Sequence, residues 1–347
     1  MSFPTRNPGR LSAALALALA SACLAPAATA DVRTMIVTSD PQYPWTAKTD
    51  ARTPQDDAER DAESQALIEE QYRSIVAYRA ARPGQDIPVF VNGDLTAYGH
   101  GAQRATMERL LKILGDNVHL GLGNHDYENN IRNDQGEGCY NNGCARDSIT
   151  DLVRHVTKKR GVVSFDFAVQ PGAFSTRYVG SLAYAVRTPG LDRVLHMQLN
   201  NHPTYAVSFD TTEGIVPARY DIESSVPWLY NLLGEHLSVP PFGTPSDRAY
   251  DFAIVHMHNP DAFNGDFART VSGVDVAAIF AGHLHRNFGY YRNIGSVPVY
   301  LSGSASQRTY LVVEHDTDEA VLRVYGVRDN DPEHKTLIDT VPTRRAG

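Results

Sequence analysis

Residues 118–126 read Val-His-Leu-Gly-Leu-Gly-Asn-His-Asp, an apolar run that passes directly into a polar cluster. The run from Val118 to Leu122 predicts a short buried strand, and the glycine after it predicts a turn where that strand ends. The Asn-His-Asp that follows would then lie at the carboxyl end of the strand. Ligands bind at this edge in open α/β sheets. The stretch therefore predicts an α/β fold with a functional site at its strand ends.

The residues before this stretch predict βαβ units. A β-branched apolar run from Arg33 to Thr38 predicts a strand, helical spacing of apolar residues follows from Asp61 to Ala80, and Ile87 to Val91 is again typical of a strand. A second helix is expected from Gly101 to Leu114. This alternation predicts parallel strands joined by crossover helices.

After Val162 the pattern changes to short strands, interrupted by one helix expected from Ile222 to His236. The polar, Gly-rich and Asn-rich segment from Asn129 to Thr150 is expected to be a surface loop rather than a domain boundary. We therefore expect an α/β sandwich of two mixed β-sheets flanked by helices, formed by one domain of residues 31–347. The later strands are expected at 163–167, 183–186, 194–199, 252–255, 276–281, 297–301, 310–313 and 321–325.

The composition is that of an ordinary globular protein. Of 347 residues, 42% are apolar and 21% charged, and 32 Lys and Arg stand against 40 Asp and Glu, for a net charge of −8. No long basic run interrupts this acidic balance, so the charge pattern does not support nucleic-acid binding. No segment after the N-terminus approaches 18 uncharged apolar residues, which argues against a transmembrane segment.

The N-terminus has the pattern of a secretory signal peptide. Arg6 and Arg10 precede an apolar run from Leu11 to Ala20, and small residues lead to Ala28-Thr29-Ala30, so residues 1–30 are predicted to be cleaved. The mature protein would be secreted or periplasmic. The alternative is a lipoprotein acylated at Cys23, which is disfavoured because Ala20, rather than a branched apolar residue, stands three positions before it.

Two cysteines remain after the predicted cleavage, Cys139 and Cys144. In an exported protein they are expected to form a disulfide, since the residues between them, Tyr140-Asn141-Asn142-Gly143, favour a turn that brings their Cα atoms together. The alternative, a pair of metal-binding thiolates, lacks the second Cys or His pair of a structural zinc site.

Polar clusters follow five apolar runs, and their residue types suit metal ions. Carboxylates, amides and imidazoles together favour divalent or trivalent ions such as manganese, iron or zinc. Two ions that share one carboxylate can hold a phosphoryl oxygen, activate a water and offset charge on the leaving oxygen, as phosphoester hydrolysis requires. The clusters are Asp40-Pro41-Gln42, Gly93-Asp94, Gly123-Asn124-His125-Asp126, His256-Met257-His258 and Gly282-His283-Leu284-His285.

These clusters resemble, in order and content, the motifs of the calcineurin-like metallophosphoesterase superfamily. Its blocks run Asp-x-His, Gly-Asp, Gly-Asn-His-Asp/Glu, a single His often before x-Pro, and Gly-His-x-His, and the resemblance covers the mature chain. It implies one metal ion held by Asp40, Gln42, Asp94 and His285, and another held by Asp94, Asn124, His258 and His283. Asp94 would bridge the two ions. His125 would lie beside them as the general acid that meets the phosphate or the leaving group.

The chain departs from the family pattern at three positions. Gln42 replaces the usual histidine, which gives that site a neutral oxygen ligand or removes a ligand. Ala97 stands where the protein-phosphatase branch has an aspartate that orients the acid histidine, so the resemblance to that branch is distant. The fourth block offers two histidines. His258 is preferred because His258-Asn259-Pro260 fits His-x-Pro, and His256 is the alternative ligand.

Simpler explanations exist for each residue taken alone: Asp40 could begin a turn, and Asp94 could cap a helix. The ordered set favours the functional interpretation. Asn200 and His202 follow a predicted strand and are candidate substrate contacts, with an ordinary turn as the alternative.

The predicted function is hydrolysis of a phosphomonoester or phosphodiester substrate by an exported two-metal enzyme. The alternatives are a phosphodiesterase specific for nucleotides or phospholipid headgroups, and a catalytically weak phosphate-binding protein on the same fold. Retention of His125 argues against the binding protein, because a binding site has no use for a leaving-group acid.

Overall fold

The computed structural model describes residues 31–238 and 248–343. The chain divides into a unit of residues 1–30 and a unit of residues 31–347, and only the second is discussed below. The predicted signal peptide and Cys23 lie outside the described residues. Among the residues described, no helix has both the length and the apolar character needed to cross a membrane.

The first sheet has six strands and is mixed. Its strands β1, β2 and β3 are parallel, and β15 pairs antiparallel with β1. The order is β17 (Thr336–Pro342), β16 (Val321–Val327), β15 (Tyr310–Asp316), β1 (Val32–Thr38), β2 (Val89–Val91) and β3 (Val118–Leu120).

The second sheet has seven strands and is also mixed. Strands β8, β11, β12 and β14 are parallel to one another, and antiparallel strands close both edges. The order is β13 (Phe288–Ile294), β14 (Val297–Ser302), β12 (Val276–Ala281), β11 (Phe252–His256), β8 (Val194–Gln198), β7 (Tyr184–Val186) and β4 (Val162–Phe165).

The central strands alternate their side chains between two cores. In β1, Met35 and Val37 belong to the core between the two sheets, whereas Ile36 faces the outer helices. In β11, Ile254 faces the inter-sheet core and Val255 faces the opposite side. Because both faces of these strands are buried, they are almost continuously apolar, as expected of parallel strands covered on both sides.

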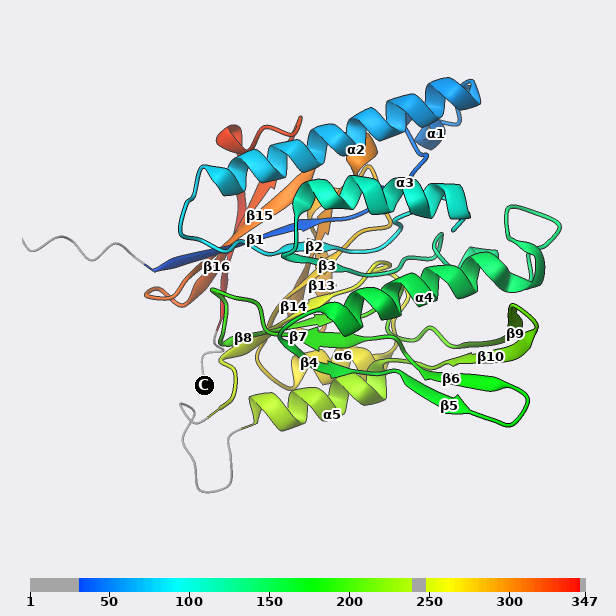
Figure 1. The fold of residues 1–347 in the computed structure, drawn as a ribbon. Helices are drawn as coiled ribbons and strands as arrows, with labels where there is room; N and C mark the ends of the chain where they lie inside the picture. Colours follow the sequence, from blue (N-terminus) through cyan, green and yellow to red (C-terminus); the bar gives the residue numbers. More distant parts are fainter. Residues whose placement is uncertain (1–30, 239–247, 344–347) are drawn as a thin grey trace, which may run out of the picture. The chain divides into compact units, whose positions relative to one another are not determined.

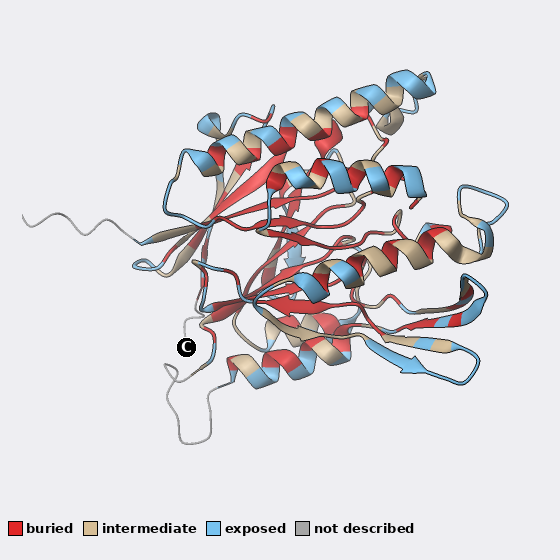
Figure 2. Cartoon of the chain, in the orientation of Figure 1, coloured by how far each residue is buried: buried red, intermediate tan, exposed pale blue. Residues whose placement is uncertain are grey.

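Helices cover the outer faces of both sheets (Figure 1). Helices α2 (Asp57–Ala80) and α3 (Gly101–Leu111) pack on the first sheet, and α5 (Val226–Leu237) and α6 (Gly265–Ser272) pack on the second. Each helix presents a buried stripe to its sheet and an exposed face to solvent (Figure 2). The predicted α/β sandwich of two mixed sheets flanked by helices is therefore confirmed.

Strands β13 and β17 and helix α6 were not predicted from the sequence, and two larger differences concern a third sheet and helix α4 (Gly143–Lys158). A small third sheet is formed by β5 (Ala168–Pro171), β6 (Thr176–Gly180), β10 (Val216–Ile222) and β9 (Val207–Glu213). The prediction of a loop from Asn129 to Thr150 was wrong in its second half, where helix α4 begins. One face of α4 is apolar and is buried in the inter-sheet core, which removes its side chains from water. This face consists of Ala145, Ile149, Leu152 and Val156.

Buried histidines give the fold a predictable response to acid. Burial lowers the pKa of His196 to about 3, whereas an unfolded histidine titrates near 6.5. The unfolded chain therefore gains a proton at His196 as the pH falls below about 6.5, and the folded protein does not until about 3. Stability is lost across that window, by about 2–3 kcal/mol at pH 4.5.

We expect His196→Gln to flatten the decline of stability between pH 6.5 and 4.5, because an amide does not titrate there. Denaturant unfolding at several pH values measures this decline. The substitution also loses the ring contact with Phe90, whose centroid lies 4.5 Å from that of His196. This loss lowers the free energy of unfolding by the same amount at every pH, so it does not affect the slope of stability against pH. Equal slopes in the two proteins would contradict the prediction.

Candidate metal centre

The predicted ligands lie at the carboxyl ends of five parallel strands, and backbone hydrogen bonds join these ends. In the first sheet, the amide of Asp40 donates to the carbonyl of Gly93 at 3.1 Å, and that of Gln42 donates to the carbonyl of Asp94 at 2.8 Å. In the second sheet, the Gly282 amide donates to the His258 carbonyl at 3.0 Å. The loops that carry the ligands are thus held against one another independently of their side chains.

Two groups of side chains offer ligand atoms to a common point. Asp94, His258 and His283 form one group, and Asp40, Asp94 and His285 form the other, with ligand atoms within 4.8 Å of one another in each. Asp94 belongs to both groups. For the carboxylates and histidines, this division agrees with the one that the family resemblance implies; Gln42 and Asn124, the amide ligands of the two predicted sites, are in neither group.

The first group converges on the Nε2 atom of His258. This atom lies 3.1 Å from Asp94 Oδ2, 3.1 Å from Asn124 Oδ1 and 3.2 Å from His283 Nδ1. A single proton on Nε2 could serve only one of these three contacts. Ligand atoms around a tetrahedral zinc ion, with bonds of about 2.0–2.1 Å, lie roughly 3.3 Å apart. The spacing therefore fits a bound metal ion better than a set of hydrogen bonds.

The protein also fixes which nitrogen of His258 is free. His258 Nδ1 lies 2.9 Å from the carbonyl oxygen of Asn92, which can only accept a hydrogen bond. Nδ1 must therefore carry the hydrogen, and neutral His258 presents the lone pair of Nε2 to the site. Metal-ligating histidines are commonly oriented in this way.

The second group joins His285 to Asp40. His285 Nε2 lies 3.3 Å from Asp40 Oδ1, and the Asp40 side chain is buried, whereas that of His285 is partly exposed. The same Asp40 carboxylate accepts hydrogen bonds from the backbone amide of His283, at 3.0 Å for Oδ2. Asp40 thus links the two histidines of the last motif to the first strand.

Gln42 is buried, and neither its amide nitrogen nor its carbonyl oxygen has a hydrogen-bond partner among the described residues. A buried amide without partners costs roughly 1–3 kcal/mol per group. Metal coordination through the amide oxygen would offset part of this cost. The observation favours Gln42 as a ligand beside Asp40 and Asp94.

We expect Gln42→His to tighten metal binding at the site of Asp40 and His285, because imidazole binds borderline metals better than an amide oxygen. Gln42→Ala should weaken it. Competition with a chromophoric chelator measures both effects. Equal metal retention in all three proteins would show that position 42 is not a ligand.

Several ligand positions have left-handed backbones. The φ angles are 51° at Asp40, 38° at Gln42, 49° at Asp94 and 70° at His283. Non-glycine residues rarely adopt positive φ, and such strain gathers at functional sites. The surrounding hydrogen bonds hold these residues in a conformation that the sequence alone disfavours.

Two motif glycines are required by close approach. A Cβ atom at Gly123 would lie 2.1 Å from Asp94 Oδ1, and one at Gly282 would lie 2.4 Å from Asp40 Oδ2. Any side chain at either position would displace a candidate ligand. These contacts give a physical reason for the glycines of the third and fifth motifs.

The electrostatics of the site favour positive charge. Burial lowers the pKa of His258, but the charges of Asp94 and Asp40 outweigh it and raise that pKa to about 9. Burial likewise opposes protonation of His285, but its hydrogen bonds with Asp40 and Asp50 raise its pKa to about 10. The pKa of Asp94 is held near 2, because the neighbouring His258 outweighs its burial. The carboxylates thus create a negative potential suited to cations.

His125 lies beside the two groups rather than within them. Its backbone amide donates to Asp94 Oδ1 at 2.9 Å, and its ring Nδ1 donates to the carbonyl oxygen of Ala97 at 2.8 Å. The backbone at position 97 therefore orients the ring, although the side chain there is only a methyl group. With Nδ1 held, Nε2 is the ring nitrogen available for proton transfer.

Asp126, the last residue of the third motif, connects two of the loops that carry candidate ligands. Its carboxylate accepts hydrogen bonds from the backbone amides of Leu95, Thr96 and Gly123 at 2.9–3.0 Å. Burial, with the nearby charge of Asp94, raises its pKa to about 6. Asp126 thus joins the loop that carries Asp94 to the loop that carries Asn124.

His256, the alternative ligand, lies in the core between the sheets. It is two residues before His258 on the same face of the strand, and its ring stacks on Phe90 with centroids 4.1 Å apart. Burial lowers its pKa well below the usual value. His256 is not part of either ligand group.

The two candidate substrate contacts differ. Asn200 is buried, and both ends of its side chain are used within the protein, at the amide of Leu122 and the carbonyl of Leu182. The predicted substrate contact at Asn200 is therefore replaced by a structural role that joins β3 to the second sheet. His202 is only partly buried, with Nδ1 3.1 Å from Thr204 Oγ1, and stays a prediction.

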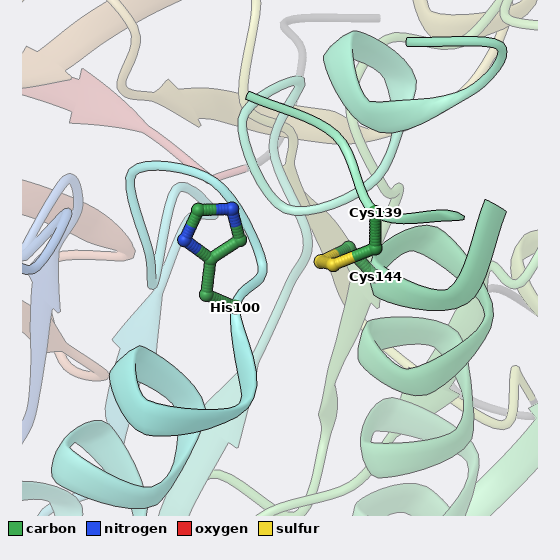
Figure 3. Close-up of side chains that lie close together, drawn as sticks. All are labelled: His100, Cys139 and Cys144. Carbon is green, nitrogen blue, oxygen red and sulfur yellow. A yellow bond between two sulfur atoms is a disulfide. The ribbon is translucent and has the colours of Figure 1, made fainter. Parts of the chain in front are cut away.

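Cys139 and Cys144 are joined by a disulfide, and His100 lies close to them (Figure 3). The potential ligand atoms of these three residues also lie within 4.8 Å of one another. The disulfide, however, leaves no thiolate to bind a metal ion, and His100 Nε2 contacts the Glu137 carbonyl at 2.7 Å. The pair therefore tethers the start of α4 rather than forming a metal centre.

A family model for calcineurin-like phosphoesterases matches residues 34–287, well over half of the chain. The chain belongs to the calcineurin-like phosphoesterase family. It is therefore a metallophosphoesterase, a hydrolase that acts on phosphoric ester bonds. The comparison with curated proteins gives no match.

Solved structures similar to this metallophosphoesterase include three phosphoesterases. A purple acid phosphatase from yellow lupin seeds is 11% identical, with a TM-score of 0.46, and the match covers 90% of this chain and 53% of that one. A 5'-nucleotidase from Candida albicans is 14% identical, with a TM-score of 0.45, coverage being 85% and 52%. A calcineurin-like phosphoesterase from Bacillus subtilis is 11% identical, with a TM-score of 0.40 and coverage of 89% of both chains.

This metallophosphoesterase spans about half the length of the lupin phosphatase and of the Candida nucleotidase. The assignment to the family rests on the family model and on the ordered motifs.

Sequence analysis did not identify Asp50 at this site. Asp50 is the last residue of the short helix α1 (Ala47–Asp50), and its Oδ1 atom lies 2.7 Å from His285 Nδ1. Burial raises the pKa of its carboxyl, but hydrogen bonding from His285 outweighs this and holds the pKa near 2. No motif or periodicity marks this residue, because its position depends on contacts distant in sequence.

Proposed function

We propose that this metallophosphoesterase is an exported enzyme that binds two metal ions and hydrolyses a phosphomonoester or phosphodiester. The observation that carries the proposal is the pair of ligand groups that share Asp94. One ion would be held by Asp40, Gln42, Asp94 and His285. The other would be held by Asp94, Asn124, His258 and His283. The mixture of imidazole and oxygen ligands suits manganese, iron or zinc.

The ligand residues fit such ions on three counts: the spacing around His258 Nε2, the unpartnered amide of Gln42, and the negative potential of the carboxylates, which raises the pKa of both His258 and His285. Bound metal ions would supply an activated water and charge neutralisation at the phosphoryl oxygens. The chain itself contributes the placement of these ligands and of a proton donor beside them.

His125 is proposed as that proton donor. Its Nδ1 is anchored to the Ala97 carbonyl, so a proton on Nε2 is directed away from the backbone and is available to a leaving oxygen. This orientation supports an enzyme over the alternative of a phosphate-binding protein. A binding site gains nothing from a ring held in this way.

Export is proposed on two observations. Residues 1–30 have the sequence pattern of a cleaved signal, and the mature chain carries a disulfide between Cys139 and Cys144. Secretion and a periplasmic location are both consistent with them. Expression with residues 1–30 in a bacterial host, followed by fractionation and N-terminal sequencing, tests this part. Retention of the uncleaved chain in the cytoplasm would contradict it.

The enzymatic proposal is tested by metal analysis together with a substrate screen. The mature protein, purified and supplied with manganese, zinc or iron, should bind close to two ions and hydrolyse at least one of three substrate classes: phosphomonoesters, nucleotide phosphodiesters and phospholipid headgroups. The preferred class decides between the general hydrolase and the specialised phosphodiesterase. A folded protein that takes up no metal ion would refute the two-metal proposal.

A further inference from the structure

We propose that Asp50 is a positioning residue that fixes the ring of His285 for metal binding. The inference deepens the proposed two-metal function and rests on it. Asp50 is not one of the metal-ligand candidates. It acts on the metal site through His285, which is one of them.

The Asp50 carboxylate collects hydrogen bonds from three separate segments of the chain. Oδ1 accepts hydrogen bonds from His285 Nδ1 at 2.7 Å and from the indole Nε1 of Trp45 at 2.8 Å. Oδ2 accepts hydrogen bonds from Ser306 Oγ at 3.0 Å and from Gln307 Nε2 at 2.8 Å. Ser306 and Gln307 lie in the short helix η5 (Ala305–Gln307), which follows the second sheet. With two donors on each oxygen, the orientation of the carboxylate is fully determined.

The contact with Asp50 selects one tautomer of His285. An ionised carboxylate only accepts hydrogen bonds, so His285 Nδ1 must carry the hydrogen. The lone pair of neutral His285 is then on Nε2, which faces Asp40 Oδ1 at 3.3 Å. Carboxylate–histidine–metal arrangements fix ring orientation and raise the basicity of the ligand. Asp50 supplies both effects at the site of Asp40 and Asp94.

The structure provides an internal comparison in the other ligand group. His258 is held in the same way through Nδ1, but by the backbone carbonyl of Asn92 at 2.9 Å. A side-chain carboxylate can be removed by substitution, whereas a backbone carbonyl cannot. Asp50 is therefore the point at which one of the two proposed metal sites can be weakened without changing any ligand of either site.

The main competing explanation is that Asp50 only ties η5 to α1. In that case its loss would lower stability but leave metal affinity unchanged. Asp316 is a suitable control, because its side chain is 4% exposed, against 8% for that of Asp50. It accepts hydrogen bonds from the amides of Asp318 and Glu319 and from Arg323, at 2.8–3.1 Å. Asp316 has no contact with any candidate ligand, so its loss reports the general cost of removing a satisfied buried carboxylate.

The experiment compares wild type, Asp50→Ala, Asp50→Asn and Asp316→Ala. Zinc affinity is measured by chelator competition and zinc content by elemental analysis. Asp50→Ala should weaken one of two zinc sites by about 10–100-fold, the usual effect of losing such a partner. Asp50→Asn should retain most of the affinity, because its carbonyl oxygen can still accept from His285. Asp316→Ala should bind zinc as wild type does, even if its melting temperature falls.

A second measurement does not depend on metal loading. Nitrogen-15 spectra of histidine in metal-stripped protein at high pH should show His285 in the Nδ1–H form in wild type and as a mixture of tautomers in Asp50→Ala. An unchanged tautomer and unchanged zinc affinity in folded Asp50→Ala would overturn the inference. Equal loss of zinc in Asp50→Ala and Asp316→Ala would also overturn it. Failure of wild type to bind zinc, manganese or iron would instead refute the two-metal proposal.

Discussion

Asp94→Asn is expected to abolish hydrolysis and to weaken both metal sites together. Asp94 belongs to both ligand groups, with Oδ2 3.1 Å from His258 Nε2 and Oδ1 accepting the amide of His125 at 2.9 Å. An amide keeps the shape but removes the charge that would serve both ions. Metal ions contribute several kcal/mol to such reactions, so the rate should fall by about 10³-fold or more. Elemental analysis and steady-state rates measure the two effects.

Two further variants serve as controls for the loss of both metal ions in Asp94→Asn. His285→Ala removes a ligand from one group only, and should reduce metal content toward one ion per chain. Asp221→Asn alters a buried carboxylate of the third sheet that pairs with Arg177 and Arg219 and lies outside both groups. It should leave metal content unchanged. If Asp94→Asn lost no more metal than His285→Ala, Asp94 would not be a shared ligand.

His125→Ala is expected to be selective among substrates. A nitrophenolate departs without a proton, whereas the alkoxide of a sugar or glycerol phosphate does not. Loss of a general acid should therefore lower hydrolysis of alkyl phosphates by about 10²–10⁴-fold and affect nitrophenyl phosphates much less. Metal content should be unchanged, since His125 is in neither ligand group. Parallel rate measurements on the two substrate types test this.

An equal loss on both substrate types would remove the acid role and leave His125 as a residue that binds phosphate or packs against its neighbours. The packing alternative has a definite partner, because the ring of Trp45 lies edge-on to that of His125 with centroids 5.4 Å apart. Trp45→Phe preserves an aromatic ring at that position. It should leave the ratio of alkyl to nitrophenyl rates close to that of wild type.

The candidate ligands could be found from the sequence because each directly follows an apolar run. Continuous apolar runs in parallel strands and the convergence of the carboxyl ends of these strands are general rules. They are sufficient to bring residues such as Asp40 and His285 together, although these are far apart in the chain. The same rules predicted the two mixed sheets and the helices α2, α3 and α5 on their outer faces, but not α6.

Other features depend on tertiary contacts that no local pattern records. The anchor of His125 is a backbone carbonyl at Ala97, so the type of side chain there carries no signal. Asp50 reaches His285 only because α1 and the last motif loop meet in space. The His-x-Pro pattern favoured His258 over His256 in the sequence, but the packing of His256 on Phe90 depends on tertiary contacts.

Helix α4 was predicted wrongly for a different reason, because its signal was present in the sequence. Its buried residues Ala145, Ile149, Leu152 and Val156 follow helical spacing that was present in the sequence. The Asn-rich and Gly-rich turn before them concealed the start of the helix, and no side chain caps that end. The helical spacing of these four residues indicates the helix more reliably than the composition of the preceding turn indicates a loop.

The sharing of Asp94 has a thermodynamic consequence for loading. An ion bound to one group neutralises part of the Asp94 charge that would attract the second ion. Each ion therefore lowers the affinity of the protein for the other, and the factor is the same in both directions. Filling should therefore proceed in two separated steps, with a singly loaded species populated when metal is scarce. Under the two-metal proposal, activity would require both ions and the singly loaded species would have none, so the supply of metal in the surroundings would set the fraction of competent enzyme.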